Sequence, residues 1–153
     1  MFCNAAIKPL FLYGGAVWSM TSTANIRRVF RLQKRAARSI LGVTTKEERT
    51  VNLFKKLDWM PFYDEINVNK LCIIFKCLQG QCPDYLCDKL VLVSDTSEKS
   101  SRYGHITLRC PKYNRKTEGG KTFLTSSILL WNSLPVKIRS SESINSFKRK
   151  YIE

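Results

Sequence analysis

A cluster of six cationic side chains near the start of the chain has the residue types and the spacing to contact phosphates. Arginine has a planar guanidinium group that pairs with two phosphate oxygens at once and also stacks on bases. Lysine adds a mobile point charge. The cluster spans residues 27–38 and consists of Arg27, Arg28, Arg31, Lys34, Arg35 and Arg38. These residues predict a surface that binds a nucleic-acid backbone.

Two further basic stretches have a related composition. Single-stranded RNA or DNA is held by cations along its backbone and by aromatic rings that stack on its bases. A solvated charged face is the ordinary explanation of any one such stretch, but three of them on one chain favour binding. The candidate residues are Arg109, Lys112, Tyr113, Arg115 and Lys116 in the first stretch, and Lys148, Arg149 and Lys150 in the second.

The charge of the chain is distributed unevenly along the sequence. The 153 residues have a formal net charge of +14 and a pI near 9.8. Segments 21–50, 99–121 and 136–153 have net charges of +6, +6 and +3, whereas segment 51–98 has −2. A nearly neutral, apolar centre between basic flanks is typical of a core with charged faces around it, and such a surface favours anionic partners.

Metal binding is an alternative use of the cysteines. Cys72, Cys77, Cys82 and Cys87 recur every fifth residue, a step that turns about 140° around a helix and keeps neighbours apart. Structural zinc prefers ligand pairs two to four residues apart. A set made of Cys82, Cys87, His105 and Cys110 remains open if a long loop joins its halves. We favour ordinary buried or loop thiols, and we therefore expect no metal and no other cofactor.

The acidic residues are not arranged for catalysis. A polymerase holds two metal ions with paired aspartates, and the metals clamp the attacking and leaving oxygens. The aspartates at 58, 64, 84, 88 and 95 are scattered, and the chain has a single histidine. We therefore expect no polymerase or nuclease activity, and no catalytic residue, in this chain.

The elements that position these residues are predicted to be helices. Segment 21–41 has apolar residues at helical spacing, with Ser22 or Thr23 as its cap and Gly42 at its end. A short helix is expected over 51–57, and a central core helix over 61–78 starts at Pro61, with acidic residues in its first turn. Shorter helices are expected over 83–90, 121–132 and 141–151, the last capped by Ser141 or Ser143. Asn132 is expected to cap or end its helix.

These elements predict a mainly α fold, a small bundle of about five helices, with a short β-hairpin as an option near residues 105–117. Trp18, Trp59 and Trp131 are expected in the core. The first twenty residues lack a convincing secretory signal, and their apolar run is too short to span a bilayer. We expect reduced cysteines and an intracellular protein of the nucleus or the cytoplasm, not secreted and without a membrane partner.

Two stretches of the chain resemble the region that ends the open reading frame of non-LTR (LINE-type, jockey-like) retrotransposons, downstream of the reverse transcriptase. Family members have a Leu-x-Trp-Leu-Pro opening, then Phe-Lys-x-Leu-x-Gly, Pro-x-Tyr-Leu, Trp-Asn-x-Leu-Pro and a terminal Ser-x-x-x-Phe-Lys. Here these motifs are LDWMP at 57–61, FKCLQG at 75–80, PDYL at 83–86, WNSLP at 131–135 and SINSFK at 143–148. Met60 departs from the usual leucine, a change that packing tolerates.

The resemblance implies a role for the chain and a division of it. Residues 1–20, with Tyr-Gly and a Trp, resemble the end of the polymerase thumb, and residues 21–153 would be one helical C-terminal domain. The implied function is that of a non-catalytic segment of an RNA-directed DNA polymerase polyprotein, which binds RNA or single-stranded DNA during reverse transcription. The rest of the parent polymerase is then a further partner. Two alternatives stay open: a docking or structural helical module with no nucleic-acid role, and a decayed element fragment.

Overall fold

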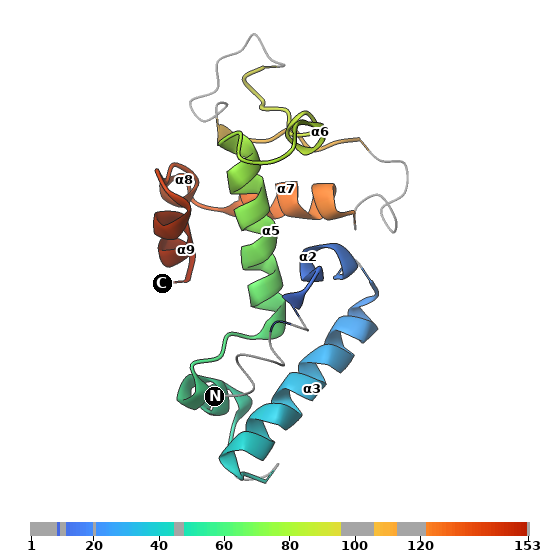
Figure 1. Cartoon of the computed structure of the whole chain (residues 1–153), viewed down its shortest axis with the longest axis vertical. Coiled ribbons are helices and arrows are strands. Elements are labelled where there is room, and N and C mark those ends of the chain that lie inside the picture. Colours follow the sequence, from blue (N-terminus) through green and yellow to red (C-terminus); the bar gives the residue numbers. More distant parts are fainter. Residues whose placement is uncertain are drawn as a thin grey trace. The chain divides into compact units, whose positions relative to one another are not determined.

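The fold is mainly helical, as the sequence predicts (Figure 1). The computed structural model describes residues 9, 12–19, 21–44, 48–95, 106–112 and 122–152. Within these ranges there are eight helices and no strand, and an isolated antiparallel bridge pairs Leu92 with Leu108. The helices are α2 (Gly15–Trp18), α3 (Thr23–Leu41), α4 (Thr50–Leu57), α5 (Phe62–Leu78), α6 (Asp84–Cys87), α7 (Phe123–Ser133), α8 (Val136–Arg139) and α9 (Ile144–Ile152).

The chain divides into two compact units, Met1–Ile66 and Asn67–Glu153. The boundary falls inside α5, so the first turn of this helix belongs to the first unit and the remainder to the second. The division of the chain at residue 20, with a thumb-like segment before it, stays a prediction. None of the helices described is long and apolar enough to cross a membrane.

In the first unit, α3 begins and ends where the sequence predicts. The Ser22 hydroxyl accepts a hydrogen bond from the backbone N–H of Asn25, which satisfies one of the free donors at the helix start. At the other end, Gly42 has a φ of 65°, and its N–H donates to the carbonyl of Arg38. Glycine adopts this left-handed backbone without a steric penalty, and it is therefore a frequent helix terminator.

The core of the first unit lies between α3 and α4. Ala37, Leu53 and Phe54 are buried, with Phe30, Leu57 and Trp59 packed against them. Gln33 lies on the same face of α3. Its side-chain amide donates to the Met60 carbonyl at 2.9 Å and accepts from the Phe62 N–H at 2.9 Å. Gln33 therefore fastens α3 to the turn that leads into α5.

The short helix α2 packs on the start of α5 within the same unit. Gly15 is buried, and a Cβ atom at this position would lie 3.3 Å from Ile66 Cγ1, so the glycine allows the close approach. The Trp18 ring stacks on Phe62 with centroids 5.4 Å apart. Trp18 is thus half-buried against a core residue.

The second unit has the larger core, in which α5, α7 and α9 meet (Figure 1). Trp131 of α7 stacks on Phe147 of α9 at 5.7 Å between centroids, and Phe75 of α5 packs on the other side of Phe147 at 5.2 Å. Trp131 is 1% exposed, so the prediction of a core tryptophan is confirmed there. Trp59 in the first unit is half-buried.

The side chains of α7 and Arg139 of α8 hold the segment that contains Ile106 and Leu108. Trp131 Nε1 donates to the Ile106 carbonyl at 3.0 Å, and the Arg139 guanidinium donates to the same oxygen at 3.2 Å. Asn132 accepts from the Leu108 N–H at 3.0 Å and donates to the Leu108 carbonyl at 2.7 Å. The prediction that Asn132 caps or ends its helix is therefore wrong, because α7 continues to Ser133 and the amide binds a distant backbone.

Several helix limits differ from the sequence expectations by a few residues. Helix α5 begins at Phe62, and the carbonyl of Pro61 accepts its first hydrogen bonds. Helix α6 ends at Cys87, short of the predicted residue 90. The sequence did not predict α8. Ser143 accepts from the Ser146 N–H at the start of α9, whereas Ser141 donates to the Ile138 carbonyl.

The predicted hairpin near 105–117 lies partly outside the described residues, which omit 105 and 113–117. The described part, 106–112, contributes Leu108 to the bridge with Leu92. This pairing is supported by hydrogen bonds from the Val93 N–H to the Thr107 carbonyl and from the Arg109 N–H to the Val91 carbonyl. The segment therefore pairs with the chain that follows α6.

Candidate nucleic-acid interface

The six cations of α3 lie on one side of the helix. At 3.6 residues per turn, their positions span an arc of about 120° around the helix axis. Four of them are exposed, while Lys34 and Arg38 at one edge of the arc are half-buried. The neighbouring arc holds Phe30, Ala37 and Leu41, which pack on α4. Burial of that apolar side fixes the basic side toward solvent.

No acidic residue within α3 neutralises these charges. In the described part of the chain an ion pair joins Lys56 Nζ and Glu48 Oε1 at 2.8 Å, and no side chain of α3 takes part in it. The cations also repel one another, because 27 and 31, 31 and 35, and 34 and 38 are four residues apart. Each such like-charge pair costs a helix about 0.2–0.5 kcal/mol. A bound polyanion would relieve this repulsion.

Two of the α3 cations also contact the body of the first unit. The Lys34 ammonium lies 4.5 Å from the centroid of the Phe30 ring, a distance suited to a cation–π interaction. Arg38 Nε is buried and has no hydrogen-bond partner among the described residues. The aliphatic stem of Arg38 is thus held against the protein.

The second basic stretch is only partly within the described residues. Arg109 and Lys112 are exposed. Arg109 follows the buried Leu108, and its own N–H is bonded to Val91, so the bridge directs its side chain outward. Tyr113, Arg115 and Lys116 lie outside the described residues.

The third basic stretch is on α9, where Lys148 and Arg149 are exposed. Lys150 is half-buried, and its ammonium donates to Ser141 Oγ at 3.3 Å and to the Lys137 carbonyl at 3.5 Å. Lys150 is therefore engaged inside the second unit, a role that the sequence did not indicate. The structure gathers the α3 cations on one arc in the first unit, and it places the other two stretches on separate elements of the second unit.

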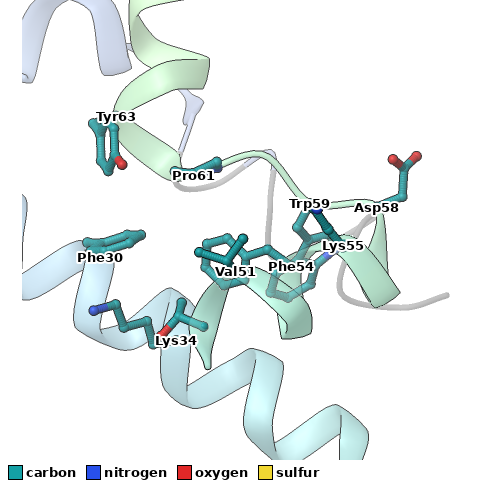
Figure 2. Close-up of a pocket in the computed structure, with 10 residues that line it drawn as sticks. Phe30, Lys34, Val51, Phe54, Lys55, Asp58, Trp59, Pro61 and Tyr63 are labelled. Atoms are coloured by element: carbon teal, nitrogen blue, oxygen red, sulfur yellow. The ribbon is translucent and has the colours of Figure 1, made fainter. Parts of the chain in front are cut away.

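An open aromatic pocket lies beside α3, and the sequence did not reveal it (Figure 2). Its volume is about 510 Å³. The residues that line it come from α3, α4, the turn after α4 and the start of α5: Phe30, Lys34, Thr50, Val51, Phe54, Lys55, Asp58, Trp59, Pro61 and Tyr63. The closely spaced aromatic residues at 54, 59 and 63 were the available signal, but their meeting with Phe30 depends on the fold.

Three thiols, those of Cys77, Cys82 and Cys87, lie near one another, in a combination that differs from the zinc set left open by the sequence. Burial, followed by interactions with the Cys82 and Cys87 thiols, raises the pKa of Cys77 to about 12. The Cys87 thiol donates to the Cys82 carbonyl at 3.4 Å. Within the described ranges, no group of three or more Cys, His, Asp or Glu side chains is arranged to hold a metal ion. His105, a member of the open zinc set, lies outside these ranges.

Comparison of the chain with models of protein families, with curated proteins and with solved structures found no match. The resemblance to the retrotransposon polymerases therefore rests on the five motifs quoted above. The candidate site is a basic face of α3 in the first unit, with an aromatic pocket at its edge.

Proposed function

We propose that the chain is a non-catalytic C-terminal segment of a retrotransposon RNA-directed DNA polymerase, and that it binds RNA or single-stranded DNA during reverse transcription. The observation that carries the proposal is the arc of six cations on α3, a helix that has no acidic residue of its own. Arginines predominate in this arc, and their guanidinium groups suit phosphate oxygens. The mutual repulsion of the cations raises the electrostatic free energy of the free protein, and a bound polyanion lowers it.

The acidic residues support the non-catalytic part of the proposal. Asp58 ends α4, Asp64 lies in the first turn of α5, and Asp84 begins α6. These three aspartates lie on separate elements and form no pair of the kind that holds two catalytic metal ions. In this proposal the parent polyprotein supplies the polymerase, and this segment adds contacts to the nucleic acid.

The test is fluorescence anisotropy of a labelled single-stranded RNA between about 50 and 200 mM salt. Release of counterions predicts a loss of affinity of about a thousandfold if six or so phosphates are contacted. Neutralising four cations together, with R27Q, R31Q, K34Q and R38Q, should flatten the salt dependence and weaken binding strongly at low salt.

A control variant with the same loss of charge separates a site from general attraction. K56Q, K76Q, K89Q and K137Q remove four exposed charges outside the three candidate stretches. This variant should keep most of the affinity and most of the salt slope. Equal losses in both variants would mean that net charge alone attracts RNA, and weak binding of the unmodified protein at every salt concentration would contradict the proposal.

A docking role is the second candidate, and exposed apolar side chains favour it. Tyr13 is 85% exposed and Val17 of α2 is 61% exposed. Leu32 and Ile40 of α3 are 49% and 45% exposed and lie outside the cation arc. Such side chains suit contact with the polymerase portion of the parent protein or with another protein. Weak RNA binding in the salt series would favour this role.

A further inference from the structure

We propose that the aromatic pocket of the first unit takes up one unstacked base of the bound strand, with the Tyr63 ring as the stacking surface. The inference rests on the proposed function, and it adds to that function a specific place for a base. Its starting observation is that the basic arc of α3 and the pocket share a residue, Lys34. A strand whose phosphates lie along α3 therefore passes the mouth of the pocket.

The aromatic rings of the pocket hold one another in fixed orientations. Phe30 meets Phe54 edge to face, with centroids 6.0 Å apart and planes at 88°, and it meets Tyr63 at 5.4 Å and 70°. Phe54 in turn meets Trp59 at 6.2 Å and 62°. Phe54 is 4% exposed, which ties this set of rings to the core of the unit. The walls are thus organised before a ligand arrives, and this lowers the entropic cost of binding.

Tyr63 is the ring of this set that is most open to a ligand. It is 44% exposed, although its contact with Phe30 restrains its orientation. In Figure 2, Tyr63 lies on the opposite side of the pocket from Val51 and Trp59, with Pro61 at its edge. Val51 is 64% exposed and supplies an apolar surface opposite the tyrosine. A flat base can stack on one side and contact an aliphatic group on the other.

The charges around the pocket select the class of ligand. Lys34, Lys55 and Asp58 line it, so two ammonium groups lie there with one carboxylate. The excess of positive charge disfavours a cationic ligand, which four aromatic rings could otherwise attract. A neutral aromatic ring that carries a phosphate matches the pocket better. The volume of about 510 Å³ is that of a small-molecule site, since such sites measure about 300–1,000 Å³.

The experiment compares two labelled oligonucleotides of equal length and charge, one with uracil bases and one whose sugars lack bases. Anisotropy titrations at fixed salt measure the affinity of the purified chain for each. The unmodified protein should bind the base-bearing strand about tenfold more tightly, as expected for a single stacked base. Y63A should abolish this difference and leave the affinity for the abasic strand unchanged.

Two further variants test whether the effect of Y63A is due to loss of the ring at position 63. Y63F retains the ring and should preserve the tenfold preference, whereas Y85A should behave as the unmodified protein. Tyr85 is a suitable control because it is a tyrosine of the second unit that is 69% exposed. Thermal unfolding of each variant checks the fold, and partial exposure of Tyr63 favours a folded Y63A.

The outcomes separate this inference from the proposed function. Strong, salt-dependent binding with equal affinity for both strands would overturn the base pocket and leave phosphate binding by α3 intact. A preference for bases that survives Y63A would also overturn it, because the stacking surface would lie elsewhere. Weak binding of both strands would remove the proposed function and the pocket inference together, and it would point to an apolar side chain of a protein partner as the occupant.

Discussion

At the scale of single residues, Lys70 is a charged side chain that is buried in the second unit. It is 8% exposed, and its ammonium donates to Ser126 Oγ at 3.3 Å. Desolvation by burial lowers the pKa of Lys70 below its ordinary value of 10.5. A neutral hydroxyl offsets less of the desolvation cost of a buried ammonium than a carboxylate would. The charged form of Lys70 therefore destabilises the fold.

We predict that K70M stabilises the second unit at pH 7 by about 1 kcal/mol, because methionine fills a similar volume without a charge. The effect should depend on pH. Since the folded state releases this proton at a lower pH than the unfolded state, the stability of the unmodified protein rises as pH climbs from the lowered pKa toward 10.5. The advantage of K70M should therefore shrink over that range. Urea unfolding followed by circular dichroism at several pH values measures the difference.

The matched control is K76M on the same helix, where the lysine is exposed. It should change the free energy of unfolding little at any pH. A destabilised K70M, or an advantage that does not vary with pH, would mean that the Lys70 ammonium is better compensated than its contact with Ser126 indicates.

At the scale of elements, the features that the sequence predicts are those with local causes. The start and end of α3 follow from Ser22 and Gly42, whose effects on the backbone are confined to neighbouring residues. The core face of α3 follows from the periodicity of its apolar residues. The polar Gln33 is accommodated on this face because its amide forms hydrogen bonds with the backbone of Met60 and Phe62, which lie far along the chain.

Features that depend on residues far apart in the chain could not be predicted from the sequence alone. Asn132 looked like a helix cap because its neighbours are Trp131 and a Ser-Leu-Pro turn, yet its partner is Leu108, 24 residues earlier. The pocket likewise needs Phe30 and Tyr63, which approach each other only when α3 and α5 pack. The residue types around Tyr113 predict stacking, whereas the spacing of Phe54, Trp59 and Tyr63 along the chain does not reveal that these rings meet Phe30.

We predict that N132A lowers the free energy of unfolding by about 2 kcal/mol, because it leaves a donor and an acceptor of Leu108 without partners. Leu108 is 1% exposed, so water does not readily replace the lost amide. Urea unfolding measures the loss, and hydrogen exchange of the Leu108 amide should accelerate. N145A, an exposed asparagine on α9, is the control. A change below about 0.5 kcal/mol would place Asn132 among ordinary surface substitutions.

At the scale of the whole molecule, the two units differ in the size of their cores. Among the described residues, the cluster of the second unit joins eight buried side chains, and that of the first unit joins three. The first unit also contains the repelling cations of α3. Local stability follows buried apolar contact, and like charges oppose it. The element proposed to bind nucleic acid therefore belongs to the unit expected to open more readily.

We predict that the amides of α3 exchange hydrogen faster than those of residues 71–75 in the free protein, and that single-stranded RNA reverses much of this difference. A ligand at about a hundred times its dissociation constant slows exchange through opening of its site by about a hundredfold. The amides of 71–75, in the core of the second unit, should change far less. Hydrogen exchange measured by mass spectrometry, with and without RNA, resolves both segments. Protection of α9 in place of α3 would move the interface to the second unit and to Lys148 and Arg149. Uniform protection of both units would instead indicate that one strand contacts them together, a result that a single cationic helix face does not predict.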